Sequence, residues 1–304
     1  MKTQIKEKNM ASTRSDPGNG KVEGKGFLKH DVENGKVWEY VVAVFLILLY
    51  MLPVYVMLNL SFRTITDLTP RLYLPARATL ENYAKAFSSR DLWKAMLNSS
   101  VYVAEVVILE VALGGIASYG LARAGGKIAA ALRTFNISIM MIPTLSLLVG
   151  TYSLMVRFNM VNKIWALSLQ TAAMGMASTM FFYTSFIVTI PKELDEAAAL
   201  DGAGTLRTFI SVIFPQLKAI TITRVIMIAV GTWNNYAMPS YLLTDISKGT
   251  IILVVRKAFS VAAGAVTNAP LACAECAVAL LPIMVLYVFL QRYIIEGQLD
   301  SVNK

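Results

Sequence analysis

The chain has 304 residues, of which 56% are apolar and only 15% are charged. Typical soluble domains carry about 25% charged residues, so this composition excludes an ordinary soluble protein and indicates a membrane protein. The formal net charge is +9. Because the basic residues are spread along the chain and form no single aromatic-studded groove, we expect no nucleic-acid partner.

The first 37 residues are basic and contain no apolar run. Such a composition predicts a disordered N-terminal tail, residues 1–37. Residues 38–297 are then predicted to form one transmembrane domain, and residues 298–304 a short C-terminal tail.

Six apolar runs follow the tail, each about as long as the 20 residues that a helix needs to cross a bilayer. Lipid cannot satisfy free backbone N–H and C=O groups, so continuous spans of this kind must be helices. The predicted fold is therefore an all-α, polytopic membrane bundle with six transmembrane helices. The runs are residues 40–62, 98–123, 135–155, 164–190, 220–243 and 271–293.

Four of these runs contain an interior proline, and each proline removes one helix hydrogen bond. Bends at these positions would suit a bundle that moves, although proline is also simply commoner in membrane helices than in soluble ones. The prolines are Pro53, Pro143, Pro239 and Pro282.

The basic tail favours a cytoplasmic N-terminus, because Lys and Arg accumulate on the cytoplasmic side of membrane proteins. Six spans would return the C-terminus to the same side and place the polar segment 190–215 there as well. The first outer segment, residues 63–94, has six basic residues against three acids and opposes this orientation. Long loops, however, count for less in the rule.

Two glutamates lie within the second run, where a carboxylate costs roughly 2.5 to 3.5 kcal/mol and usually faces water or the bundle interior. Glu105 and Glu110 are five residues apart, so on a helix they point about 140° away from each other. We expect that both do not line one narrow pore, and that one could pair with a neighbouring subunit.

The remaining candidates for chemistry are few. Cys273 and Cys276 lie in the last apolar run, and the single histidine, His30, lies in the tail. No hydrolytic triad can be assembled from these residues, and no metal site is expected because zinc usually needs two more ligands. We predict a protein that is not an enzyme and holds no metal or cofactor.

The polar segment 190–215, IPKELDEAAALDGAGTLRTFISVIFP, separates two apolar runs. Pro191 and the acids after it favour a helix start, and the alanines continue the helix. Gly202 can adopt the positive φ that ends such a helix. Thr205 is then predicted to cap a second helix, which ends at Pro215. One apolar face of this second helix comprises Leu206, Phe209, Ile210 and Ile213.

Most connections between helices are short and lack this alternation of alanine-rich helix, glycine turn and apolar stripe. The segment therefore predicts a stiff helical hairpin that projects from the membrane, and not a solvated loop.

The stretch EAAALDGAGTLRTFISVIFP resembles the EAA loop of permease subunits of binding-protein-dependent ABC importers. That pattern is E-A-A, three residues, G, nine residues, I, one residue and L-P. Val212 and Phe214 stand where the family has Ile and Leu, and both stay apolar. The predicted ATPase-coupling residues are Glu196, Ala197, Ala198, Asp201, Gly202 and Pro215.

Further stretches, among them GTWNNYAMPSYLL and LQRYIIEGQ, resemble the smaller permease subunit of the sugar-importing, maltose-type branch. The resemblance covers about residues 37–297. It implies a type I ABC importer permease fold in the lipid of the bacterial plasma (inner) membrane. It also implies as partners a second permease subunit, an ATPase subunit dimer and an extracytoplasmic solute-binding protein.

In such importers the hairpin docks in a cleft of the ATPase, whose closure switches the bundle from inward-open to outward-open. Ala197 and Ala198 would allow close packing in that cleft, Glu196 would meet a basic residue, and Gly202 would fix the turn. ATP is expected on the separate subunit. A Walker A loop here would need Gly at 121 and Ser or Thr at 128, where this chain has Leu121 and Ile128.

Candidates for the substrate path are Asn234, Asn235, Trp233 and Tyr236, together with Glu105 and Glu110. Amides and aromatic faces suit sugar hydroxyls and C–H surfaces, but intramembrane Asn can equally hold helices together. The outer connection 244–270 resembles in position the loop that such permeases insert into the docked binding protein, although a plain flexible loop fits as well.

Arg256 and Lys257 in this outer connection would suit an acidic, alginate-like oligosaccharide or an acidic binding protein. The predicted function is a permease subunit that moves an oligosaccharide into the cytoplasm by alternating access. The alternatives are a permease for amino acids or phosphate, and a stand-alone membrane enzyme or receptor.

Overall fold

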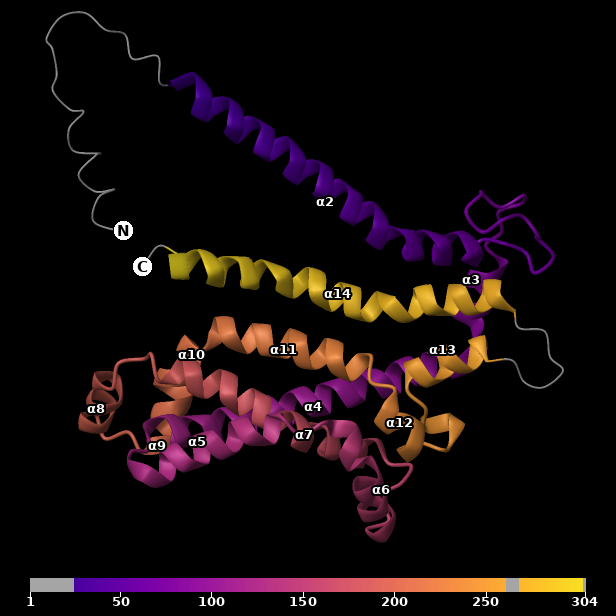
Figure 1. Ribbon diagram of the computed structural model, residues 1–304. Helices are drawn as coiled ribbons and strands as arrows, with labels where there is room; N and C mark the ends of the chain where they lie inside the picture. The colour runs from indigo at the N-terminus through magenta and orange to yellow at the C-terminus, as the bar shows by residue number, and fades with distance from the viewer. Residues whose placement is uncertain (1–24, 261–267, 303–304) are drawn as a thin grey trace, which may run out of the picture. The chain divides into compact units, whose positions relative to one another are not determined.

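A computed structural model describes residues 25–260 and 268–302, and the regular structure in these ranges is helical. The chain divides into two units at Tyr55 and Val56, and each unit is described by itself. Figure 1 shows the elements in chain order.

The described part of the first unit belongs to helix α2, Lys25–Ser61, which contains Pro53. Its portion Val37–Ser61 is long and apolar enough to cross a membrane. The helix begins within the predicted tail, and residues 1–24 lie outside the described residues.

In the second unit, a buried arginine organises the segment between α2 and helix α3, Glu81–Ser88. Arg63 is only 1% exposed. Its guanidinium donates to Asn59 Oδ1 at 2.9 Å and to three backbone carbonyls between residues 69 and 73. Asn82 of α3 donates to the carbonyl of Arg63 at 2.7 Å. These bonds satisfy the buried charge. They hold the segment between α2 and α3 in one folded arrangement.

Helices α4, Arg90–Arg123, and α7, Ile164–Ile187, form the centre of the second unit, where they pack on each other more extensively than any other pair. Close approach requires small residues on α4. A Cβ at Gly114 would lie 2.7 Å from the methyl group of Thr179, so the missing side chain lets the two backbones come together.

The third predicted span, residues 135–155, bends at its interior proline, as the sequence predicts, and is divided into separate helices. Helix α5, Gly126–Met140, stops before Pro143, and the chain resumes as the short helix η1, Thr144–Leu147, and helix α6, Leu148–Arg157. The two halves meet at an angle of 88°. Proline lacks an N–H and disfavours helical φ and ψ in the residue before it, so the break falls where Pro143 stands.

The fifth predicted span, residues 220–243, is also broken. Helix α11, Lys218–Trp233, contains Arg224 and ends nine residues after it. The chain then continues in a separate short helix, α12, Ala237–Leu242, which contains Pro239. Residues 244–260 then form helices η3, Ile246–Lys248, and α13, Ile251–Phe259. Most of the connection 244–270 before residue 261 is therefore helical and not a plain flexible loop.

The last helix, α14, spans Ala269–Val302, contains Pro282 and extends into the predicted C-terminal tail. It packs against α3, α11 and α13. Cys273 is buried in it, and Cys276 is partly buried against the core.

Three helices in the described ranges are long and apolar enough to cross a membrane, or up to five if each of two bent helix pairs is one span. Helix α7 is not among them, because it carries many polar residues that face other helices. Its buried polar side chains are Ser168, Gln170, Thr179 and Thr184. The polytopic helical fold is confirmed, whereas the count of six spans stays a prediction.

Candidate functional site

The predicted hairpin at residues 190–215 forms, and its first half agrees with the sequence analysis. Helix α8 spans Glu193–Leu200 and has three acids in its first turn. Gly202 has φ +78°, and the N–H of Gly202 donates to the carbonyl of Ala199 at 3.0 Å. The positive φ is the left-handed conformation that glycine adopts without strain, so the turn depends on this residue.

The second half of the hairpin differs from the prediction in two ways. Helix α9, Thr205–Thr208, is preceded by Gly204, and the Thr205 side chain makes no capping bond. Residues Phe209–Ile213 form the π-helical turn η2, followed by α10, Phe214–Gln216. A π-turn rotates the faces of the helix, so Phe209 and Ile213 are buried while Leu206 and Ile210 are more than half exposed.

The predicted ATPase-coupling residues do not all share one surface. Ala198 is 7% exposed and packs inside the chain, whereas Ala197 and Glu196 are exposed. The two alanines therefore lie on different faces of α8, because successive helix positions point about 100° apart, and their predicted role in docking stays a prediction. Asp201, Gly202 and Pro215 are exposed.

A contact that the sequence analysis missed ties the hairpin to α4. Asp195 accepts a hydrogen bond of 2.5 Å from the hydroxyl of Tyr119 and lies 2.7 Å from the guanidinium of Arg123. Arg123 also donates to the carbonyls of Ile187 and Ile190, both at 3.1 Å. The side chains of Arg123 and Asp195 are only 15% and 19% exposed. We call Asp195, Arg123 and Tyr119 the hairpin clamp.

Aromatic packing supports the hairpin clamp from the other half of the hairpin. The ring of Phe209 lies 5.4 Å from that of Tyr119, and an added Cβ at Gly115 would lie 3.2 Å from Phe209. Both halves of the hairpin therefore contact the same end of α4. Figure 1 shows α8, α9 and α10 grouped at this end of the second unit.

The second group of interest is a buried ion pair that joins α4, α7 and α11. Glu110 and Arg224 are 3% and 5% exposed and approach to 3.4 Å. Thr179 donates to the Glu110 carboxylate and accepts from Arg224 at 2.7 Å. The guanidinium lies 5.0 Å from the centre of the Phe182 ring. The sequence shows that Arg224 is a cation inside the fifth apolar run. It does not show that the partner of Arg224 is Glu110, which lies 114 positions away.

The two glutamates of α4 have different surroundings, as their angular separation predicts. Glu105 is only partly buried, and within the described residues its Oε2 atom is buried without a hydrogen-bond partner. Glu110 lies in the bundle interior with Arg224. The prediction that both do not line one pore stays a prediction.

The four path candidates at residues 233–236 separate into different environments. Trp233 is in the hydrophobic core, 6% exposed. Asn234 is exposed and bonds to its own helix at the carbonyl of Val230. Asn235 donates to the hydroxyl of Tyr102 at 3.0 Å, which supports the helix-joining interpretation for this amide.

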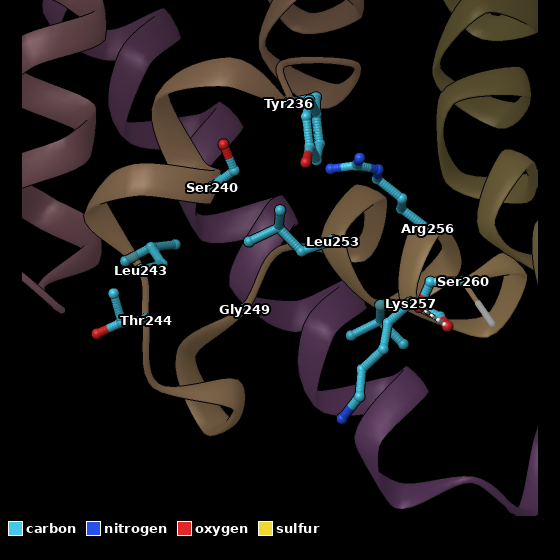
Figure 2. Close-up of a pocket in the computed structure, with 10 residues that line it drawn as sticks. Tyr236, Ser240, Leu243, Thr244, Gly249, Leu253, Arg256, Lys257 and Ser260 are labelled. Carbon is cyan, nitrogen blue, oxygen red and sulfur yellow. Dashed lines mark hydrogen bonds between the residues drawn. The ribbon is translucent and has the colours of Figure 1, made fainter. Parts of the chain in front are cut away.

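Tyr236 is the member of that group that lines a cavity of about 410 Å³ between α12 and α13. The guanidinium of Arg256 lies over its ring at 4.2 Å, and Figure 2 shows the two side chains stacked at the cavity wall. Lys257 lines the same cavity, and the described residues that line it include no carboxylate. The two basic residues that the sequence analysis singled out here, Arg256 and Lys257, therefore line one cavity.

Comparison with known proteins identifies a family that agrees with the interpretation of the hairpin as an EAA loop. Residues 111–297 match the model of the family described as binding-protein-dependent transport system inner membrane component. The chain is 35% identical over 250 residues to the melibiose/raffinose/stachyose import permease protein MelC of Bacillus subtilis, covering 82% of this chain and 89% of that protein. It is 26% identical to the probable starch degradation products transport system permease protein AmyC of Thermoanaerobacterium thermosulfurigenes, covering 86% and 94%.

A solved structure shows the same fold. The crystal structure of a bacterial ABC transporter involved in the import of the acidic polysaccharide alginate aligns with a TM-score of 0.73 at 18% identity, covering 91% of this chain and 99% of that one. The resemblance drawn from the EAA loop is confirmed by these matches. The chain, a multi-pass membrane protein, belongs to the inner membrane components of binding-protein-dependent transport systems.

Proposed function

We propose that this chain is one permease subunit of an ATP-driven importer that passes an oligosaccharide from a binding protein into the cytoplasm. The support for the substrate class is the 35% identity to a permease named for melibiose, raffinose and stachyose. The likeness to the alginate importer supports the fold alone. The proposed partners are a second permease subunit, an ATPase dimer and an extracytoplasmic solute-binding protein.

One observation carries the mechanism: helix α4 is in contact with both the hairpin and the buried ion pair. The hairpin clamp lies at Tyr119 and Arg123, and Glu110 lies on the same helix. At a rise of 1.5 Å per residue, Glu110 and Arg123 are about 20 Å apart along its axis. A force on α8 therefore reaches the centre of the bundle through one continuous helix.

The proposed cycle begins when the exposed face of α8, with Glu196 and Ala197, docks in the ATPase subunit. Closure of the ATPase dimer on ATP moves the hairpin, and the hairpin clamp moves α4 with it. A nearly complete switch of a two-state bundle needs a difference on the order of 5 kcal/mol in ATP binding between the two states. The hairpin is then on the cytoplasmic side, as are both chain termini.

Reconstitution tests this function. The chain is co-expressed with the permease, ATPase and binding protein encoded beside it, and uptake of radiolabelled raffinose into proteoliposomes is measured with ATP inside. Glu196→Lys should detach or uncouple the ATPase, because the reversed charge lies on the exposed docking face. Lys192→Glu, an exposed change before α8, is the matched charge control.

Uptake that needs ATP and the binding protein, and that Glu196→Lys abolishes, would support the proposal. Accumulation of amino acids or phosphate but of no oligosaccharide would overturn the substrate class. Wild-type uptake and co-purification in Glu196→Lys would overturn the docking role of α8.

A further inference from the structure

A second cavity, of about 320 Å³, lies between α4, η1, α7 and α11, separate from the cavity of Figure 2. Its size falls within the range of roughly 300 to 1,000 Å³ that is usual for small-molecule sites. Two glycines, Gly175 and Gly231, line it, and beside Gly231 there is open space. Its polar lining comprises Glu110, Thr144, Thr171, Ser178, Arg224 and Thr232.

The buried ion pair leaves hydrogen-bonding capacity unused at this cavity. Glu110 uses its Oε2 atom for Thr179 and Arg224. Its Oε1 atom makes neither of these bonds and lies against Gly175, where an added Cβ would come within 2.1 Å. The Nε atom of Arg224 is buried without a partner among the described residues. An unsatisfied buried group of this kind is costly, and a ligand could satisfy it.

The charges of the pair determine which ligand fits. Glu110 and Arg224 carry opposite charges 3.4 Å apart, so the cavity wall has no net charge, and an anionic ligand would meet the Glu110 carboxylate. Vicinal hydroxyls can both donate to a carboxylate and accept from a guanidinium or a hydroxyl. Met174, Met227 and Ile228 supply the apolar part of the lining, which suits the C–H face of a sugar ring.

We propose that this cavity is a binding subsite for one ring of a neutral oligosaccharide, with Glu110 and Arg224 as its hydrogen-bonding pair. The inference rests on the proposed function, since it names a site and a charge class for the imported sugar. An acidic sugar is not expected to bind in this cavity. Arg256 and Lys257 lie in the other cavity, which has no carboxylate among the described residues of its lining.

A cavity-filling substitution tests the subsite without removing a charge. A Cβ at Gly231 would meet no atom within 4 Å, so Gly231→Leu can be accommodated while its side chain enters the cavity. The matched control is Gly120→Leu, because Gly120 also has open space, lies in a helix near its end and lines neither cavity. We expect raffinose uptake to fall about tenfold or more in Gly231→Leu and not in the control, with both complexes assembled.

A thiol reporter gives a direct measure of occupancy. In a background with Cys273 and Cys276 changed to Ala, Met227→Cys places a thiol in the cavity wall, and Val230→Cys places one on the same helix outside the lining. Alkylation by N-ethylmaleimide is then timed with and without raffinose. At about nine times the dissociation constant, raffinose should slow alkylation of Met227→Cys about tenfold and leave Val230→Cys unchanged. A trisaccharide of hexuronic acid should not protect.

The outcomes separate this inference from the proposed function. Wild-type raffinose uptake by Gly231→Leu, no protection of Met227→Cys, or equal protection by the hexuronate would overturn the neutral subsite and leave the importer intact. If the wild-type complex imports no oligosaccharide at all, the proposed function itself fails.

Discussion

At the scale of single residues, Gly175 is the position on which the buried ion pair most directly depends. Glu110 needs the space beside α7 that a side chain would occupy, since a Cβ at Gly175 would lie 2.1 Å from its Oε1 atom. Helix stability alone would favour alanine over glycine by about 1 kcal/mol. Breaking a buried ion pair typically costs about 3 to 5 kcal/mol, which is more than the gain in helix stability from alanine.

The first prediction follows from this comparison. Gly175→Ala should displace Glu110, separate it from Arg224 and lower the free energy of unfolding by about 3 kcal/mol. The measurement is thermal unfolding of the purified complex in detergent. Gly120→Ala is the control, because its Cβ would meet no atom within 4 Å. Equal midpoints for the two variants would show that Glu110 has room to move and that the pair is not held by α7.

Gly202 and Gly204 form a natural pair for a second residue-scale prediction. Both would accept a Cβ without contact, but only Gly202 has a positive φ, +78°. Gly202→Ala should strain the turn by about 1 to 2 kcal/mol and lower the affinity of the hairpin for the ATPase by a factor of about 5 to 30. Gly204→Ala should have no such effect. Pull-down titration of the ATPase measures both, and matching affinities would contradict the role of the turn.

At the scale of elements, the arrangement is a short surface hairpin attached to a long helix through a small number of polar and aromatic contacts. Helix α8 has only eight residues, and isolated helices of this length are marginal in water. Its position is therefore set by tertiary contacts, of which the hairpin clamp on α4 and the burial of Phe209 and Ile213 are the main ones.

The third prediction concerns the hairpin clamp. Asp195→Asn retains an acceptor for Tyr119 but removes the charge beside Arg123, a loss of about 1 to 2 kcal/mol for a charge-assisted contact. We expect ATP-driven uptake to fall about tenfold while the ATPase still co-purifies, because the docking face of α8 is unchanged. Glu193→Gln, an exposed neutralisation in the same first turn, is the control.

An opposite result is equally informative for the hairpin clamp. If Asp195→Asn retains full uptake, or loses the ATPase altogether, α8 does not transmit its motion to α4 through this ion pair. A decrease of the same size in Glu193→Gln would mean that the net charge of the helix matters and that the contact with Arg123 does not.

At the scale of the whole molecule, the importer proposal requires the two ends of α11 to face opposite sides of the membrane. The hairpin enters α11 at Lys218, after a bend of 82°, and α12 and η3 follow its other end. Thr205 and Ser247 are both exposed, and they lie before and after this helix. Their accessibility from the two sides tests the proposed orientation.

The fourth prediction is a labelling pattern. After Cys273 and Cys276 are changed to Ala, Thr205→Cys should react with a membrane-impermeant thiol reagent only from the cytoplasmic side. Ser247→Cys should react only from outside. Labelling of both from one side would mean that α11 does not cross the membrane, and labelling with the sides exchanged would reverse the proposed orientation.

The sequence by itself determined the helical membrane class, the hairpin at residues 190–215 and its family. These features depend on neighbours in the chain: runs of apolar residues must form helices in lipid, and the turn at Gly202 requires only a residue that tolerates positive φ. The predicted cap at Thr205 and the single apolar face of the second hairpin helix were wrong, because the helix begins after Gly204 and its period changes at the π-turn Phe209–Ile213.

Only the tertiary structure decided which charged residues meet. Glu110 and Arg224 are separated by 114 positions, and Asp195 accepts a hydrogen bond from Tyr119 across 76. A sequence pattern shows that each ion in a membrane segment needs a partner, but it does not show which one. That choice depends on how closely the helices approach, and here the approach is set by glycines such as Gly114 and Gly175, whose missing side chains make the space.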